Sequence, residues 1–86
     1  FLISDFLKLR KILLKNNIDQ DKIIKYYFHK NQRWDLYFKN NIIIKLPNQN
    51  IIKALKLYKS FIDNNEIKPN TIIDLRVNNR LILGNG

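Results

Sequence analysis

The stretch from residue 33 to residue 47 constrains the fold most, because it has the pattern of two strands joined by a tight turn. Apolar and polar side chains alternate over residues 33–38, which is the period-2 pattern of a strand with one buried face. Asn40-Asn41 follows, and Asn tolerates the positive φ that a short hairpin turn requires. Residues 42–46 then return as a second apolar strand. We therefore expect a hairpin that buries Trp34, Leu36 and Phe38 and leaves Arg33, Asp35 and Tyr37 on a solvated or hydrogen-bonded face.

Three further segments complete the predicted sheet. Residues 22–30 are rich in β-branched and aromatic side chains, which favours a strand that pairs with residues 33–38 through a turn at Asn31-Gln32. Near the end of the chain, residues 71–77 and 80–84 alternate or concentrate apolar side chains and are separated by Asn78-Asn79. This arrangement predicts a second hairpin with the same turn chemistry as the first.

Two segments have the apolar spacing of amphipathic helices, residues 1–15 and residues 51–63. Asn48 or Asn50 is expected to cap the start of the second helix. We therefore expect an α+β fold, with a mostly antiparallel β-sheet and two amphipathic helices packed on one face. The residues expected on the buried helix faces are Leu2, Phe6, Leu9 and Leu13 in the first helix and Ile51, Ala54, Leu55, Tyr58, Phe61 and Ile62 in the second.

The length of 86 residues predicts one small domain that spans residues 1–86. The chain contains no cysteine, which excludes disulfides, thiolate zinc sites and cysteine nucleophiles. It has no apolar run of about 18 residues, so we expect neither a membrane span nor a signal peptide within it. Because the chain opens on Phe1 rather than Met, we expect a fragment of a longer protein, with any membrane anchor upstream.

The formal net charge of +9 raises a second possibility, which is a small basic nucleic-acid-binding domain. In that hypothesis the lysine stripes of the helices contact phosphates, and Tyr26, Tyr27 or Tyr37 stacks on bases. The competing explanation is compositional, because Lys, Asn and Ile are abundant together, as A/T-rich codons would produce. Arginine, the residue that best makes bidentate contacts with phosphates and bases, occurs only four times, at residues 10, 33, 76 and 80.

The chain offers little for catalysis, and we expect neither an enzyme nor a cofactor, a metal ion or a small-molecule substrate. It has no Ser-His-Asp arrangement and no glycine-rich phosphate loop, and its one histidine, His29, is expected to be a surface or edge side chain. Two charge pairs, Arg33 with Asp35 and Asp74 with Arg76, are expected to form weak cross-strand contacts. Alternatively, these charges face a charged partner.

The last predicted strand, residues 80–84, is the most suggestive feature of the sequence. If it lies at the edge of the sheet, its outer N–H and C=O groups have no partner within these residues, and Leu81, Ile82 and Leu83 make the edge apolar. Such an edge can accept an added strand from another protein. The alternative is that residues beyond Gly86 cover it.

The ordered motifs of this sequence resemble those of the C-terminal β domain of the bacterial cell-division protein family FtsQ (DivIB). The resemblance extends over roughly residues 1–85 and covers most of such a β domain. It rests on Arg-Trp-Asp-Leu at residues 33–36, Ile-Lys-Leu-Pro at 44–47, the Ala-Leu pair at 54–55, and Ile-Asp-Leu-Arg at 73–76, followed by a turn and a short apolar strand.

This resemblance implies a single-pass inner-membrane protein whose folded domains face the periplasm. It also implies a non-enzymatic scaffold role in the division complex, in which the domain docks the division proteins FtsB and FtsL. The strand after the Asp-Leu-Arg motif would take a segment of FtsB by strand addition, and Arg76 would meet an acidic group of the partner. The partner-binding residues carried over by position are Arg76, Val77, Asn79, Arg80, Leu81 and Leu83.

Overall fold

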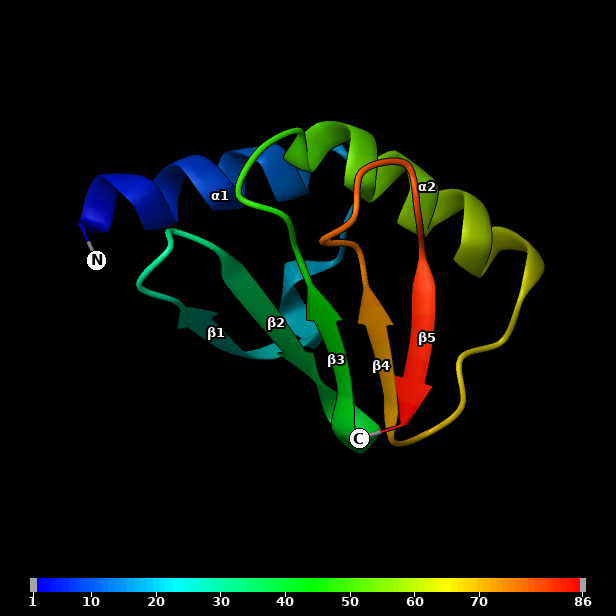
Figure 1. The fold of residues 1–86 in the computed structure, drawn as a ribbon. Coiled ribbons are helices and arrows are strands. Elements are labelled where there is room, and N and C mark those ends of the chain that lie inside the picture. Colours follow the sequence, from blue (N-terminus) through cyan, green and yellow to red (C-terminus); the bar gives the residue numbers. More distant parts are fainter. Residues whose placement is uncertain (1, 86) are drawn as a thin grey trace.

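The structure, a computed structural model, describes residues 2–85, so Phe1 and Gly86 of the predicted helix and domain lie outside the described residues. Within these residues, α1 is followed by three strands and α2 by two, and two short 3-10 turns (η1 and η2) lie beside the first strands (Figure 1). In order, the elements are α1 (Ile3–Lys15), η1 (Gln20–Lys22), β1 (Ile23–Phe28), β2 (Trp34–Phe38), η2 (Lys39–Asn41), β3 (Ile42–Lys45), α2 (Ile51–Asn64), β4 (Thr71–Asp74) and β5 (Ile82–Asn85).

The five strands form one sheet in the order β1-β2-β3-β4-β5. The pairs β1–β2, β2–β3 and β4–β5 are antiparallel, whereas β3 and β4 are parallel. The parallel pair arises because the chain leaves β3 at one end of the sheet, crosses back through α2 and enters β4 at the opposite end, where β3 also begins. The α+β class and the mostly antiparallel sheet are thus confirmed, and the sheet is mixed at its centre.

The hairpin expected around Asn40-Asn41 is present. Phe38 pairs with Ile42 across the turn, and both Asn40 (φ 63°) and Asn41 (φ 57°) adopt the left-handed conformation. Most L-residues avoid this region, whereas Asn enters it at low cost because its short polar side chain bonds locally. The local sequence therefore determines both the position of this turn and the register of β2 against β3.

Paired residues give the sheet two chemically different faces. Leu36 lies opposite Ile44, and Ile44 lies opposite Ile73, so these three side chains form one row across the central strands. All three are fully buried. Successive side chains of a strand point to opposite faces, so the neighbouring row of Asp35, Lys45 and Asp74 lies on the other face.

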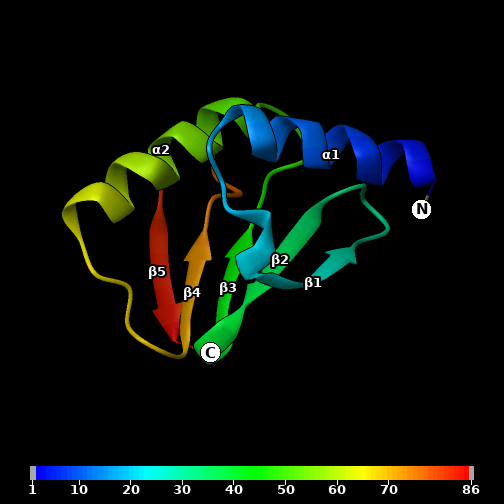
Figure 2. The same cartoon turned by 180° about the vertical axis from the view of Figure 1, so that it is seen from behind.

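Both helices contribute to the hydrophobic core that contains this apolar row. Figures 1 and 2 show α1 and α2 running close to each other along the sheet. Leu9 and Leu13 of α1 and Leu55 and Tyr58 of α2 are buried in the same cluster as the strand residues. Each of the larger side chains contributes about 1.5 to 3 kcal/mol on burial.

Three local expectations are corrected by the structure. The strand expected over residues 71–77 ends at Asp74, and the one expected over residues 80–84 begins at Ile82. Asp74 ends its strand because its carboxylate accepts the backbone N–H of Arg76 (3.0 Å), which turns the chain. Asn50 is the N-cap residue of α2, but it is left-handed and its side chain makes no capping hydrogen bond.

We expect Leu36→Ala to lower the free energy of unfolding by about 2–5 kcal/mol, because it leaves a cavity in the middle of the buried row. The matched control is Leu14→Ala, which removes the same atoms from a side chain that is 69% exposed and should cost less than about 0.5 kcal/mol. Urea denaturation followed by Trp34 fluorescence measures both values. Equal losses in the two variants would contradict the assignment of the core.

Candidate functional site

β5 is an edge strand, as the sequence predicted. It pairs with β4 on one side, from Thr71–Asn85 to Asp74–Ile82, and no other strand of residues 2–85 pairs with it. All four of its residues are exposed, and Leu83 has 52% of its surface accessible. An edge strand has alternate N–H and C=O groups directed outward, so β5 presents a free row of backbone donors and acceptors.

The connection between α2 and β4 passes along the outer side of β5. Figures 1 and 2 both show this segment, residues 65–70, beyond β5 at that end of the sheet. Its own hydrogen bonds go elsewhere: the Asn70 N–H donates to the Asn40 carbonyl (2.9 Å), and the Thr71 hydroxyl donates to the Lys68 carbonyl (2.7 Å). Within the described residues, this connection makes no backbone hydrogen bond to β5.

The loop that leads into β5 contains most of the predicted site residues. Arg76, Val77, Asn79 and Arg80 are all exposed and lie between β4 and β5 rather than in a strand. The Arg80 N–H donates to the Val77 carbonyl (3.1 Å), which closes a β-turn, and Asn79 has the positive φ (61°) that such turns use. We call residues 75–81 the hairpin loop.

The two remaining predicted site residues belong to β5 or lie directly before it. Leu81 is the last residue of the hairpin loop, is half-buried and packs against the core, whereas Leu83 is in the strand. Leu83 pairs with the fully buried Ile73. The fold thus brings all six predicted residues to one corner of the sheet, although only Leu83 lies in the edge strand.

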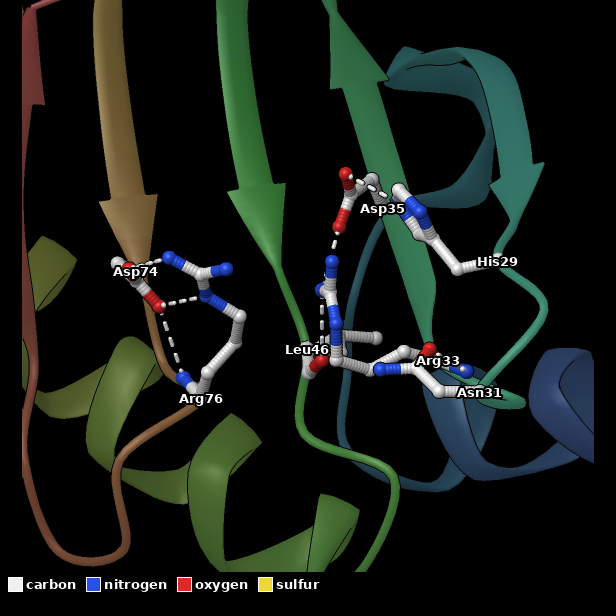
Figure 3. A network of polar contacts seen from close by, with 7 residues as sticks. All are labelled: His29, Asn31, Arg33, Asp35, Leu46, Asp74 and Arg76. Atoms are coloured by element: carbon white, nitrogen blue, oxygen red, sulfur yellow. Dashed lines mark hydrogen bonds and ion pairs between the residues drawn. The ribbon is translucent and has the colours of Figure 1, made fainter.

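Arg76 is held by Asp74 at the start of the hairpin loop. Its Nε donates to Asp74 Oδ1 (2.9 Å) and its Nη2 donates to Oδ2 (2.7 Å), so the guanidinium binds the carboxylate with two parallel hydrogen bonds (Figure 3). This is a contact within one strand end, not the cross-strand pair that the sequence suggested. Arginine has five N–H donors, and the Arg76 side chain is 46% exposed, so its other donors face solvent.

The same contact changes the acidity of both groups. The side-chain hydrogen bond from Arg76 lowers the pKa of the Asp74 carboxyl, and the charges of Arg76 and Lys45 lower it further, while partial burial opposes them. The hydrogen bond to Asp74 raises the pKa of Arg76. Asp74 is therefore a carboxylate and Arg76 a cation at neutral pH.

A second polar network, of which the sequence indicated only the Arg33–Asp35 pair, lies on the same face of the sheet. Arg33 Nη1 donates both to Asp35 Oδ1 (2.7 Å) and to the Leu46 carbonyl (3.1 Å), and His29 Nε2 lies 2.8 Å from Asp35 Oδ2. Figure 3 shows Asp35 between His29 and Arg33. The Arg33–Asp35 contact was predicted to be a weak cross-strand pair, but it joins the residue just before β2 to the second residue of that strand, and both residues are more than 90% buried.

Burial gives this network a structural role. A carboxylate away from water is costly unless its oxygens are paired, and here each oxygen of Asp35 has a partner. Arg33 also donates to the Leu46 carbonyl, so the network joins the start of β2 to the chain that follows β3. The sequence signal that could have indicated this burial is a charged residue, Asp35, inside an apolar strand, with Arg33 two residues before it.

The described residues contain no group suited to a metal ion and no helix suited to a bilayer. No cluster of three His, Cys, Asp or Glu side chains occurs within residues 2–85. At 13 and 14 residues, α1 and α2 both fall short of the length that a transmembrane helix needs.

An α+β domain with an exposed, unpaired edge strand belongs to a class of folds well suited to binding other proteins. The family model described as "Cell division protein FtsQ/DivIB, C-terminal" matches residues 2–76. The chain therefore belongs to this family of non-enzymatic cell-division proteins, and the resemblance that its motifs indicated is confirmed. No curated protein and no solved structure matches it.

The extent of the match divides the predicted site. Residues 2–76 include both helices, β1 to β4 and Arg76, whereas Val77, the rest of the hairpin loop and β5 lie beyond the matched residues. The family match thus establishes a cell-division domain, but it does not extend to β5, the edge strand.

We expect Arg33→Leu to destabilise the domain by about 3 kcal/mol, because it leaves the buried Asp35 carboxylate without its cationic partner. The double variant Arg33→Leu, Asp35→Leu should recover part of this loss, since it removes both charges. Arg76→Leu is the control, because its half-exposed pair with Asp74 should be worth only about 0–1 kcal/mol. Chemical denaturation gives all three values, and an Arg33 variant as mild as the Arg76 variant would refute the role of burial.

We expect Arg76→Gln to raise the pKa of the Asp74 carboxyl toward its ordinary value of 3.8, as measured by NMR titration of that carboxyl. In the wild type the native pKa lies below the unfolded one, so the contact stabilises the fold fully above the unfolded pKa. The stability difference between wild type and variant should vanish as the pH falls through the native pKa. An unchanged Asp74 titration in the variant would show that Arg76 does not cause the shift.

Proposed function

We propose that this domain docks partner division proteins, FtsB and FtsL, by accepting a segment of FtsB as an added strand on the free side of β5. The observation that carries the proposal is the exposed, unpaired edge of β5. Main-chain hydrogen bonds along such an edge provide affinity, and the side chains beside it provide specificity. Membership of a cell-division family supports protein partners over a small-molecule substrate.

In this proposal the six predicted residues have different roles, which depend on their positions in β5 and the hairpin loop. Leu83 flanks the added strand from within β5, and Leu81 holds the end of the hairpin loop against the core. Arg76 offers the donors that Asp74 does not use to an acidic group of the partner. The exposed residues Val77, Asn79 and Arg80 shape the surface that the partner meets before it reaches the strand.

The remaining parts of the proposal concern the packing of the helices and the attachment of the domain to the membrane. We infer that α1 and α2 both cover the apolar face, since their buried residues share a core with Leu36, Ile44 and Ile73. Residues 1–86 would then form a single domain, and neither helix would cover the other sheet face, which carries Asp35, Lys45 and Asp74. We also infer that a single-pass anchor elsewhere in the protein holds this domain at the inner membrane, on the periplasmic side.

Two proline variants test strand addition. Successive pairs of an antiparallel ladder alternate between residues that bond their partner and residues whose N–H and C=O point away. Of Ile82 and Leu83, one therefore bonds β4 and the other directs its N–H outward. We expect one of Ile82→Pro and Leu83→Pro to keep the thermal stability of the wild type and yet lose capture of an FtsB C-terminal peptide in a pull-down.

The result that would refute docking at this edge is wild-type capture by the proline variant that remains folded. The same proteins should be titrated with non-specific DNA at physiological salt, where we expect no binding. Micromolar binding that weakens steeply with salt would support the nucleic-acid alternative instead.

A further inference from the structure

A cavity of about 400 Å³ opens between the start of α2 and the hairpin loop. It is lined on one side by residues 47–50 and the first turns of α2, and on the other by residues 75–80. Figure 1 shows why these distant segments meet: the connection from β3 into α2 and the loop before β5 lie at the same end of the sheet. The volume is near the lower limit for small-ligand sites, which suits one or two side chains.

The walls of this cavity carry only positive charge. Three of its lining residues are cations, Lys53, Arg76 and Arg80, and none is Asp or Glu. Arg76 is neutralised in part by Asp74, which does not line the cavity. Within residues 2–85, the side chains of Lys53 and Arg80 take part in no hydrogen bond or ion pair. A concave surface lined by one sign of charge attracts ligands of the opposite sign.

The floor of the cavity is apolar, and its rim offers further donors. Ala54, Leu57 and the buried Leu75 supply aliphatic surface. Asn48, Gln49 and Asn50 line the cavity beside the start of α2, and their side-chain amides can donate hydrogen bonds to a ligand. A ligand that fits therefore combines a short apolar stem with a terminal carboxylate, which describes a glutamate or aspartate side chain.

We propose that this cavity binds an acidic side chain of the same partner segment that adds to β5. The inference rests on the proposed function, because the hairpin loop that forms one wall runs directly into Ile82, the first residue of β5. A segment laid along β5 that continues past this end of the strand reaches the cavity. Lys53 and Arg80 then neutralise the acid, and the partner is recognised by its charge as well as by its backbone.

Charge reversal at Lys53 tests the proposal. Lys53→Glu should weaken binding of a synthetic FtsB C-terminal peptide at least tenfold, as measured by isothermal titration calorimetry. An acidic residue in the first turn of a helix is favourable, so the variant should keep its fold. The matched control is Lys56→Glu, which makes the same change on the same helix outside the lining of the cavity and should alter binding less than twofold.

Peptide variants identify the contact. One acidic residue of the peptide, when changed to its amide, should abolish the difference between wild type and Lys53→Glu, and its change to Lys should restore binding to Lys53→Glu. If wild type and Lys53→Glu bind the peptide equally while the folded proline variant of β5 does not bind it, the proposed role of the cavity is refuted. Strand addition to β5 is then still supported. Absence of binding by the wild-type domain overturns both proposals.

Discussion

The packing of Leu36, Ile44 and Ile73 in one buried row is the constraint on which the rest of the structure depends. These three side chains come from β2, β3 and β4, and each is fully excluded from solvent. A shift of β2, β3 or β4 by one residue in one direction would bring Asp35, Lys45 or Asp74 into the core. The register that buries this row therefore also sets the positions of Asp35, Lys45 and Asp74 on the opposite face.

That opposite face links the core to the exposed edge at β5. Asp74 occupies the last position of β4, and its contacts with the side chain and backbone of Arg76 turn the chain into the hairpin loop. The loop then delivers the chain to β5 and forms one wall of the cationic cavity. The register of the sheet thus fixes the position of Asp74, and Asp74 in turn determines where β4 ends and the loop toward β5 begins.

Features that depend on neighbouring residues could be predicted from the sequence. The turn at Asn40-Asn41 follows from the conformational tolerance of Asn, and the antiparallel pairing of β4 with β5 follows from a second Asn-Asn pair between two apolar segments. The family was recognisable because several short motifs keep their order along the chain.

Features that depend on distant segments could not be predicted in the same way. The parallel pairing of β3 with β4 requires the crossover through α2, and no local pattern encodes which strand lies beside which. The burial of Arg33 and Asp35 depends on Leu46 and His29, which reach them only after folding. In the sequence, Lys53 cannot be distinguished from the other lysines of the polar helix face. Its place in the cavity depends on how α2 packs beside the hairpin loop.

The crossover through α2 has a consequence for the order of assembly. Strands β1, β2 and β3 are joined by short turns and can associate early, since contacts between residues close in sequence form at little entropic cost. The hairpin of β4 and β5 is equally local, but it pairs with β3 only after the intervening helix has brought it back to the sheet. We therefore expect the sheet to be completed last at β5, so that the edge proposed to accept a strand exists only in the fully folded domain.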